Sequence, residues 1–175
     1  IILSPIFVIT AIAVKSDGGP AFYKQVRLTK DGKPFEILKF RSMRVDAEKG
    51  GVARLSTGDK DDRITKVGHI IRACRLDELP QLFNILIGDM SLVGPRPERP
   101  QYVEKFKEEI PRYMIKHQVR PGLTGWAQIN GYRGDTSIRK RIEYDIYYIE
   151  NWSMSFDFKI MFLTIFRGFI NENAY

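Results

Sequence analysis

The chain has 175 residues, of which 28 are lysine or arginine and 21 are aspartate or glutamate, giving a formal net charge of +7. This length suffices for one domain with a hydrophobic core and is short for two. The charge favours anionic partners, such as phosphates, nucleic acid or anionic lipid, without choosing among them. The single cysteine, Cys74, excludes an internal disulfide framework and fits a reducing setting, where we expect it to be chemically inert.

The chain opens with an apolar run, IILSPIFVITAIAV, and does not begin with methionine, so we expect further residues before it. A bilayer-spanning helix needs roughly 20 apolar residues. A shortened spanning helix, a buried core helix and a re-entrant membrane hairpin are therefore all open. Pro5 favours the re-entrant hairpin, because proline bends a helix at the residues before it. No secretory signal peptide is expected.

A β-hairpin is predicted after the turn residues of SDGGP. Two runs rich in aromatic and β-branched residues, AFYKQVRL and PFEILKF, flank the turn sequence Lys30-Asp31-Gly32-Lys33. Asp-Gly between such runs is a strong hairpin signal, since both residues tolerate a positive φ. The polar, glycine-rich residues 44–62 that follow predict a solvated loop.

Helical periodicity begins after this loop. Apolar residues recur at helical spacing through residues 63–76 and leave the basic residues on other faces, which predicts a basic amphipathic helix. Pro80 suits the first turn of a new helix and not the interior of an old one, so we expect a break near Asp77. The second helix should end at Gly88.

The second half of the chain is predicted to be mostly helical. Prolines open two short helical segments, at residues 100–110 and 111–118, and residues 119–134 form a glycine-rich irregular segment. From Asp135 onward an isoleucine stripe predicts another helix. The tyrosines and tryptophan that crowd it suit a membrane interface or a core edge equally. The apolar tail, residues 156–170, predicts a helix that is buried or lies in a lipid surface.

Asp77 and Glu78 are adjacent where the second of these helices is expected to begin. A carboxylate before a helix satisfies free backbone N–H groups and complements the helix dipole. The same position with nearby arginines attracts phosphate and could hold a carboxylate against a phosphoryl group. Position alone therefore leaves both the capping and the chemical interpretation open.

The neighbouring residues supply the groups of a phosphate site. Such a site needs Mg²⁺, held by one or two carboxylates, and arginines for bidentate contacts. Besides the two carboxylates, residues 72–99 contain four arginines: Arg72, Arg75, Arg96 and Arg99. Arg96 lies between two prolines that restrict its backbone.

Other classes of site lack their usual patterns. The two histidines, His69 and His117, and Cys74 show none of the zinc spacings. The sequence contains no Walker A loop and no GxGxxG element, which removes the main support for nucleoside triphosphatase and dinucleotide-binding functions. No nucleic-acid-binding module pattern accompanies the aromatic residues, so we expect no nucleic acid partner.

The order and number of motifs make the chain resemble the bacterial sugar transferase family, the monotopic polyprenyl-phosphate phosphoglycosyl transferases. The matching stretches cover nearly the whole chain: LSP, GPAFYKQVRL, GKPFEILKFRSM, DDRITKVGHIIR, LDELPQLFNILIGDMSLVGPRPE, RPGLTGWAQINGYRG and KRIEYDIYYIENWS. One stretch departs from the family, because ACRLDE stands where TSLDE is common.

The resemblance implies transfer of a sugar 1-phosphate from a UDP-sugar, with a hexose favoured, to a polyprenyl phosphate such as undecaprenyl phosphate, with release of UMP. Asp77 would be the nucleophile that forms a phosphosugar aspartate, and Glu78 would ligate Mg²⁺ with it or orient the reacting groups. The family places phosphate-contacting residues at Arg72, Arg96 and Arg133, and Lys39 matches the lysine of its KFRSM stretch. This transfer begins exopolysaccharide and glycoconjugate assembly.

The resemblance also implies a mostly helical α+β fold with a small β-hairpin. Residues 1–16 would be part of a re-entrant membrane helix bent at Ser4-Pro5. Residues 17–175 would form a catalytic domain with interfacial amphipathic helices, at the cytoplasmic face of the bacterial inner membrane. A homodimer is compatible with it. The competing hypothesis is a non-catalytic basic module that binds anionic lipid or nucleic acid.

Overall fold

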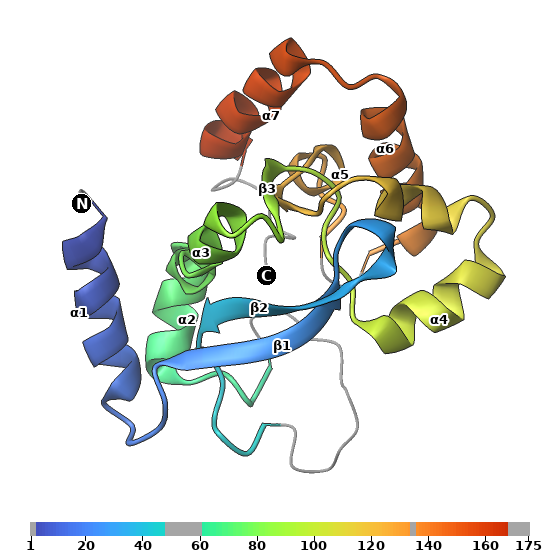
Figure 1. The fold of residues 1–175 in the computed structure, drawn as a ribbon. Coiled ribbons are helices and arrows are strands. Elements are labelled where there is room, and N and C mark those ends of the chain that lie inside the picture. The colour runs from blue at the N-terminus through green and yellow to red at the C-terminus, as the bar shows by residue number, and fades with distance from the viewer. Residues whose placement is uncertain (1–2, 48–60, 134–135, 168–175) are drawn as a thin grey trace.

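The structure is a computed structural model that describes residues 3–47, 61–133 and 136–167. Its helices are α1 (Ser4–Lys15), α2 (Lys66–Ala73), α3 (Gln81–Leu86), α4 (Pro100–Glu109), α5 (Trp126–Ile129), α6 (Ile138–Glu150) and α7 (Met154–Arg167). The 3-10 helices are η1 (Lys30–Gly32), η3 (Leu76–Glu78) and η4 (Tyr113–Gln118), and the strands are β1 (Phe22–Leu28), β2 (Pro34–Phe40), β3 (Ser91–Val93) and β4 (Gly122–Thr124). The predicted α+β class is confirmed, with helices grouped around a two-stranded hairpin (Figure 1).

The hairpin prediction is confirmed. Strands β1 and β2 pair antiparallel from Phe22 opposite Phe40 to Leu28 opposite Pro34. The connection is the 3-10 helix η1, in which Asp31 has a φ of 59°. Aspartate is one of the few residues besides glycine that adopts this left-handed conformation readily, so the turn chemistry fixes the register of the hairpin.

The short strands β3 and β4 pair in parallel, which the sequence did not predict. Residues 119–134, expected to be irregular, contain both β4 and α5. A Cβ atom on Gly122 would lie 2.1 Å from the backbone nitrogen of Gly94, so only glycine permits this close approach. The expectation was wrong because the pairing partner of β4 lies far earlier in the chain, where local composition carries no information about it.

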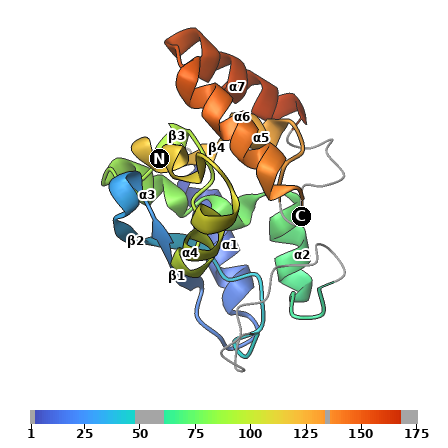
Figure 2. The ribbon, with the colours of Figure 1, turned by 90° about the vertical axis from the view of Figure 1, so that its right-hand side faces the viewer.

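Helix α6 connects two parts of the core. Its residues Ile142 and Ile146 pack with Val103 of α4 and Tyr113 of η4. On another side, Tyr148 of α6 packs with residues of β3, α5 and α7. In both ribbon views α6 and α7 lie above the hairpin (Figure 2). The isoleucine stripe after residue 135 therefore predicted the helix correctly, and its buried face holds the second half of the fold together.

Helix α1 lies at the edge of the molecule (Figure 1). Its buried residues are Thr10 and Val14, whereas Ile9 and Ile12 are 66% and 67% exposed. Within the described residues, no helix has both the length and the apolar character needed to cross a bilayer. The re-entrant form and the bend at Ser4-Pro5 stay predictions, because α1 begins at Ser4 and residues 1–2 lie outside the described ranges.

Arg41 joins α1 to the hairpin. The Arg41 guanidinium donates hydrogen bonds to the backbone oxygen of Val14 at 3.0 Å, to that of Pro20 at 2.8 Å and to the Asp17 carboxylate at 2.8 Å. Phe40 packs on Val14 and on Ile71 of α2. Helix α1 is thus packed and hydrogen-bonded at its C-terminal end, while the division of the chain at residue 16 stays a prediction.

The remaining helix predictions are largely confirmed. The helix expected in residues 63–76 is α2, and its N-cap Thr65 accepts a hydrogen bond from the Gly68 N–H. Helix α3 ends shortly before Gly88, whose φ is +91°. Of the two proline-opened segments, the first is α4 and the second is the 3-10 helix η4. Residues 48–60 of the predicted loop and 168–170 of the predicted tail helix lie outside the described residues.

Candidate active site

The carboxylate pair lies in η3, the sharp connection between α2 and α3. Arg75 precedes this turn with a φ of 56°, a left-handed conformation that costs free energy for a residue with a side chain. The capping interpretation of Asp77 is wrong, because the residue at the N-cap of α3 is Pro80 and η3 has no side-chain cap. The turn instead places Asp77 inside the molecule, where 8% of it is exposed.

Glu78 is held by cations from two other segments. Lys39 Nζ on β2 donates to Glu78 Oε1 at 2.7 Å, and both terminal nitrogens of Arg96 lie 3.5 Å from the same oxygen. Burial acts to raise the pKa of Glu78, but the charges of Lys39 and Arg96 outweigh it and the pKa falls well below its usual range. Glu78 is therefore a fixed, ionised carboxylate.

Asp77 differs from its neighbour in having a free carboxylate. Among the described residues, none donates a hydrogen bond to it. Burial raises its pKa, the charges of Lys39, Arg72 and Arg96 partly oppose this rise, and the charge of Glu78 adds to it. A carboxylate without hydrogen-bond partners, in a low-dielectric and positively charged setting, has its lone pairs available for a phosphorus atom or a metal ion.

Two further arginines named in the sequence have unsatisfied nitrogens. The Nη1 atom of Arg72, in the last turn of α2, and the Nε atom of Arg133 are buried without a hydrogen-bond partner among the described residues. A buried donor left unpaired costs roughly 1–3 kcal/mol, so such atoms commonly face a ligand or water. The structure brings Lys39, Arg72 and Arg96 to the carboxylate pair, whereas within the described residues Arg133 forms no ion pair with it.

Asn84 supports this arrangement and was missed by the sequence analysis. Its side-chain amide donates to the backbone oxygen of Glu36 at 2.8 Å, and its oxygen accepts from the Leu38 N–H at 3.0 Å. These bonds fix α3 to β2 directly beside Lys39. The available signal was a single amide inside the apolar run LFNILI, since a buried amide needs both a donor and an acceptor.

The carboxylate pair fits a magnesium ion that is shared with a substrate. Within the described part of the chain, no group of three or more His, Cys, Asp or Glu side chains could hold a metal. Mg²⁺ is usually bound by one or two carboxylates together with substrate phosphates and water. Asp77 and Glu78 supply that number and type of ligand, with nearby cations for the phosphate oxygens.

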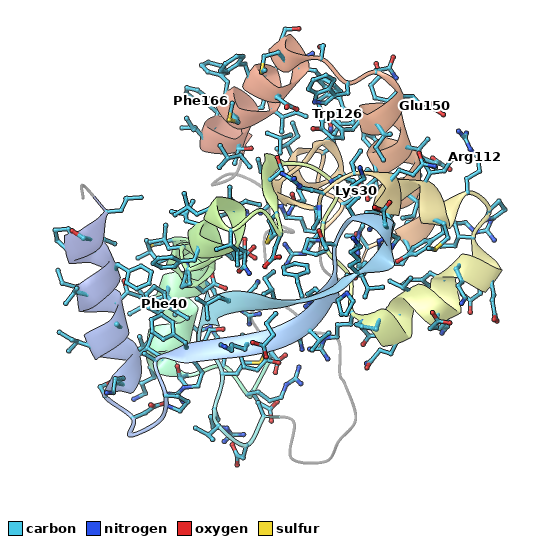
Figure 3. The ribbon with its side chains drawn as sticks, in the orientation of Figure 1. Lys30, Phe40, Arg112, Trp126, Glu150 and Phe166 are labelled. Atoms are coloured by element: carbon cyan, nitrogen blue, oxygen red, sulfur yellow. The ribbon has the colours of Figure 1, made fainter. Side chains whose placement is uncertain are left out.

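Exposed apolar side chains gather on three helices. Phe83 and Leu86 of α3 are 52% and 80% exposed, and Ile87 at its C-cap is 72% exposed. Helix α1 exposes its isoleucines, and α7 exposes several phenylalanines. In Figure 3 Phe166 extends from α7 toward the side of the molecule on which α1 lies. Exposed apolar residues in such number mark a surface for a membrane or a protein.

Comparison with known proteins gives matches along nearly the whole chain. Residues 1–171 match the family described as "Bacterial sugar transferase". The chain is 48% identical over 180 residues to the "UDP-glucose:undecaprenyl-phosphate glucose-1-phosphate transferase" of Escherichia coli K12, and the match covers 100% of this chain and 38% of the relative. The Klebsiella pneumoniae protein of that name is 49% identical with the same coverage.

A relative with a different sugar matches nearly as well. The "UDP-N-acetylgalactosamine-undecaprenyl-phosphate N-acetylgalactosaminephosphotransferase" of Aeromonas hydrophila is 47% identical over 167 residues, 94% of this chain and 39% of the relative. The chain therefore spans less than half the length of these three curated relatives.

Proposed function

The chain belongs to the bacterial sugar transferase family, and on that premise we propose that it transfers a sugar 1-phosphate from a UDP-sugar to a polyprenyl phosphate such as undecaprenyl phosphate. UMP is the other product, and UDP-glucose, the donor in the names of two relatives, is our first candidate. One observation supports the proposal most directly. Asp77 is a buried carboxylate without hydrogen-bond partners among the described residues, and it adjoins Glu78, which cations hold in place.

We propose a transfer in two steps. An Asp77 carboxylate oxygen attacks the phosphorus that carries the sugar, an aspartyl–phosphorus bond forms, and the bond from that phosphorus to the oxygen of UMP breaks. An oxygen of the polyprenyl phosphate then attacks the same phosphorus, which forms the lipid diphosphate sugar and releases the Asp77 carboxylate. Division into two steps lets a soluble donor and a lipid acceptor react in turn at one nucleophile.

The neighbouring residues have separate roles in this proposal. Lys39 holds Glu78, and Arg72, Arg96 and Arg133 bind phosphate oxygens, for which guanidinium groups are suited. Asp77 and Glu78 would hold Mg²⁺, which when bound neutralises charge on the transferred phosphoryl group. The raised pKa of Asp77 keeps it a stronger base than an exposed aspartate, and therefore a better nucleophile once ionised.

We further propose that the protein acts at the cytoplasmic face of the bacterial inner membrane. The exposed apolar side chains of α1, α3 and α7 support insertion into one leaflet, where the polyprenyl phosphate is found. In this setting residues 1–16 form part of a re-entrant helix and the product begins exopolysaccharide assembly. A homodimer is compatible with this placement.

The test measures UMP release by the full-length protein in lipid nanodiscs containing undecaprenyl phosphate and Mg²⁺. Asp77→Asn should lower the rate at least a thousandfold, roughly the loss on removing a nucleophile, while Asp46→Asn, an exposed aspartate, should leave it unchanged. Intact mass after incubation with UDP-glucose alone should show a hexose phosphate on the wild type and none on Asp77→Asn.

Three results would separate the alternatives. Wild-type rates in Asp77→Asn would exclude Asp77 as the nucleophile. Turnover of UDP-N-acetylgalactosamine but not of UDP-glucose would replace UDP-glucose as the proposed donor and leave the proposed two-step mechanism unchanged. Binding to anionic vesicles that falls steeply with salt, without any UMP release, would instead favour the non-catalytic basic module.

A further inference from the structure

A second cluster of charged side chains lies apart from Asp77 and Glu78 and is largely buried. Arg141 Nη1 donates to Glu98 Oε1 at 2.9 Å, and Lys116 Nζ lies 3.9 Å from the same oxygen and 3.4 Å from Asp145 Oδ2. The four side chains are between 2% and 11% exposed. They come from three segments, namely the connection between β3 and α4, the 3-10 helix η4 and helix α6.

One member of this cluster, which consists of Glu98, Lys116, Arg141 and Asp145, lies close to Arg96 in the chain. Only Pro97 separates Glu98 from Arg96. The backbone on this side is anchored to β1, because the Glu98 oxygen accepts from the Leu28 N–H at 3.2 Å and the Pro97 oxygen from Arg27 Nη1 at 3.3 Å. The Glu98 side chain adds the ion pair with α6.

On its other side Arg96 is anchored by the parallel strand pair. The Gly94 N–H donates to Thr124 at 2.9 Å, and the Pro95 oxygen accepts from the Gly122 N–H at 2.9 Å. The prolines on either side of Arg96 have no N–H to donate, so the segment depends on these flanking contacts. Arg96 therefore projects toward Glu78 from a short span fixed at both ends.

Stability alone does not explain why four charges are buried here. Apolar residues of similar volume often stabilise a protein as well as a buried ion pair does, whereas buried ionic groups can specify one arrangement of the chain. The position of Arg96 needs such specification, since a displacement of about 1 Å in a positioning group can cost a hundredfold in rate.

We propose that Glu98 is a positioning residue, which through its buried ion pair with Arg141 holds Arg96 in the orientation that serves the transfer. The inference rests on the proposed function, in which Arg96 binds the phosphate. Glu98 touches neither Asp77 nor Glu78 in any contact between described residues, and it acts through the backbone that it anchors.

The principal variant is Glu98→Gln, which keeps the shape of the side chain and removes its charge. In the nanodisc assay we expect kcat to fall about tenfold to a hundredfold, with KM for the UDP-sugar changed less than threefold. The charged variant Glu98→Asp should recover part of kcat. The matched control is Glu36→Gln, which removes an exposed ion pair of the same 2.9 Å length, Lys24 with Glu36, and should leave kcat unchanged.

Hydrogen–deuterium exchange provides a readout that does not need activity. Peptides covering residues 91–99 should take up deuterium faster in Glu98→Gln than in the wild type, whereas peptides of the hairpin should not change. If Glu98→Gln does not fold, Arg141→Lys can replace it, because lysine keeps the positive charge and lacks the planar guanidinium group. Residues 91–99 should then take up deuterium faster than in the wild type, to a smaller extent, and the hairpin should not change.

The two readouts separate this inference from the proposed function. A wild type that releases no UMP contradicts the proposed function, while unchanged exchange at residues 91–99 still contradicts the anchoring by Glu98. Wild-type kcat in a Glu98→Gln protein with a lowered melting temperature would show a purely structural ion pair and overturn the inference.

Discussion

Two pairs of carboxylates lie among cations in the described part of the chain, and they differ in what surrounds them. At the candidate active site, the Lys39 and Arg96 side chains that contact Glu78 are 19% and 33% exposed. In the cluster around Glu98, the Lys116 and Arg141 side chains are 2% and 6% exposed.

The two sites also differ in how their carboxylates are paired with cations. The first site leaves the Asp77 carboxylate and one nitrogen of Arg72 without partners among the described residues, and both can accept a substrate. In the second cluster each carboxylate lies within 4 Å of a cation, although Lys116 Nζ, Arg141 Nε and Asp145 Oδ2 make no hydrogen bond with the described residues. The same residue types therefore serve chemistry where a carboxylate such as Asp77 has no ion-pair partner among the described residues, and serve positioning where a buried ion pair joins two segments.

The largest effect on stability is expected from breaking the closed cluster. Arg141→Met leaves the Glu98 carboxylate buried without its 2.9 Å partner and with Lys116 3.9 Å away, which should lower the free energy of unfolding by about 3–5 kcal/mol. The melting temperature should fall by about 10 °C. Arg112→Met, which removes an exposed pair with Glu150 (Figure 3), should shift it by less than about 2 °C. A similarly small shift of the melting temperature in Arg141→Met would show that the buried ion pair stabilises the fold no more than the exposed one.

A smaller effect, on activity, is expected from removing the Lys39 charge at the candidate active site. Lys39→Met removes the 2.7 Å contact to Glu78, a charged hydrogen bond worth about 1.5–3 kcal/mol, so kcat/KM should fall roughly tenfold to a hundredfold. Burial raises the pKa of the nucleophile Asp77 and the charge of Lys39 opposes this rise, so loss of Lys39 should raise that pKa further and move the acid limb of the pH–rate profile to higher pH. Lys24→Met, an exposed lysine on β1, should leave the profile in place, and an unshifted profile in both variants would argue against the role of Lys39.

The smallest effect near neutral pH concerns His117, beside the closed cluster. Burial, followed by the charge of Lys116, lowers the pKa of His117 from 6.5 to about 4. The unfolded chain then binds more protons between these values, so stability is lost as the pH falls from 6.5 toward 4, by at most about 1.4 kcal/mol per pH unit. His117→Gln should remove this contribution.

Denaturant unfolding of the wild type and of His117→Gln between pH 4 and 6.5 checks whether His117 lowers the stability as the pH falls. Burial raises the pKa of Asp145 to about 6, which acts in the opposite direction because the folded protein then holds the extra proton. The difference between wild type and His117→Gln isolates the histidine. The exposed His69→Gln should follow the wild type, and parallel curves for all three proteins would refute the prediction.

Local chemistry in the sequence predicted much of the fold. Asp31-Gly32 fixed the hairpin because turn geometry depends on the turn residues themselves. The isoleucines of α6 predicted a helix because an apolar stripe at helical spacing must be buried on one side. Pro80 predicted the break between two helices beside the carboxylate pair. The order of the motifs indicated the family.

Other features depended on partners far away in the chain. The pairing of β3 with β4, the contact of Lys39 with Glu78 and the ion pair of Glu98 with Arg141 each join residues separated by more than 25 positions. No local pattern distinguishes Glu98 from a surface glutamate. Burial decides its role, and burial is a property of the assembled fold.

The sequence by itself thus determined the hairpin, the main helices, the family and the candidate nucleophile, because these rest on neighbouring residues and on motif order. Only the tertiary structure decided that Asp77 is buried with a free carboxylate rather than capping a helix, and that Glu78 is the carboxylate the cations hold. The physical reason is that hydrogen-bond partners and desolvation, which set the charge state and availability of each carboxylate, come from segments that meet only on folding.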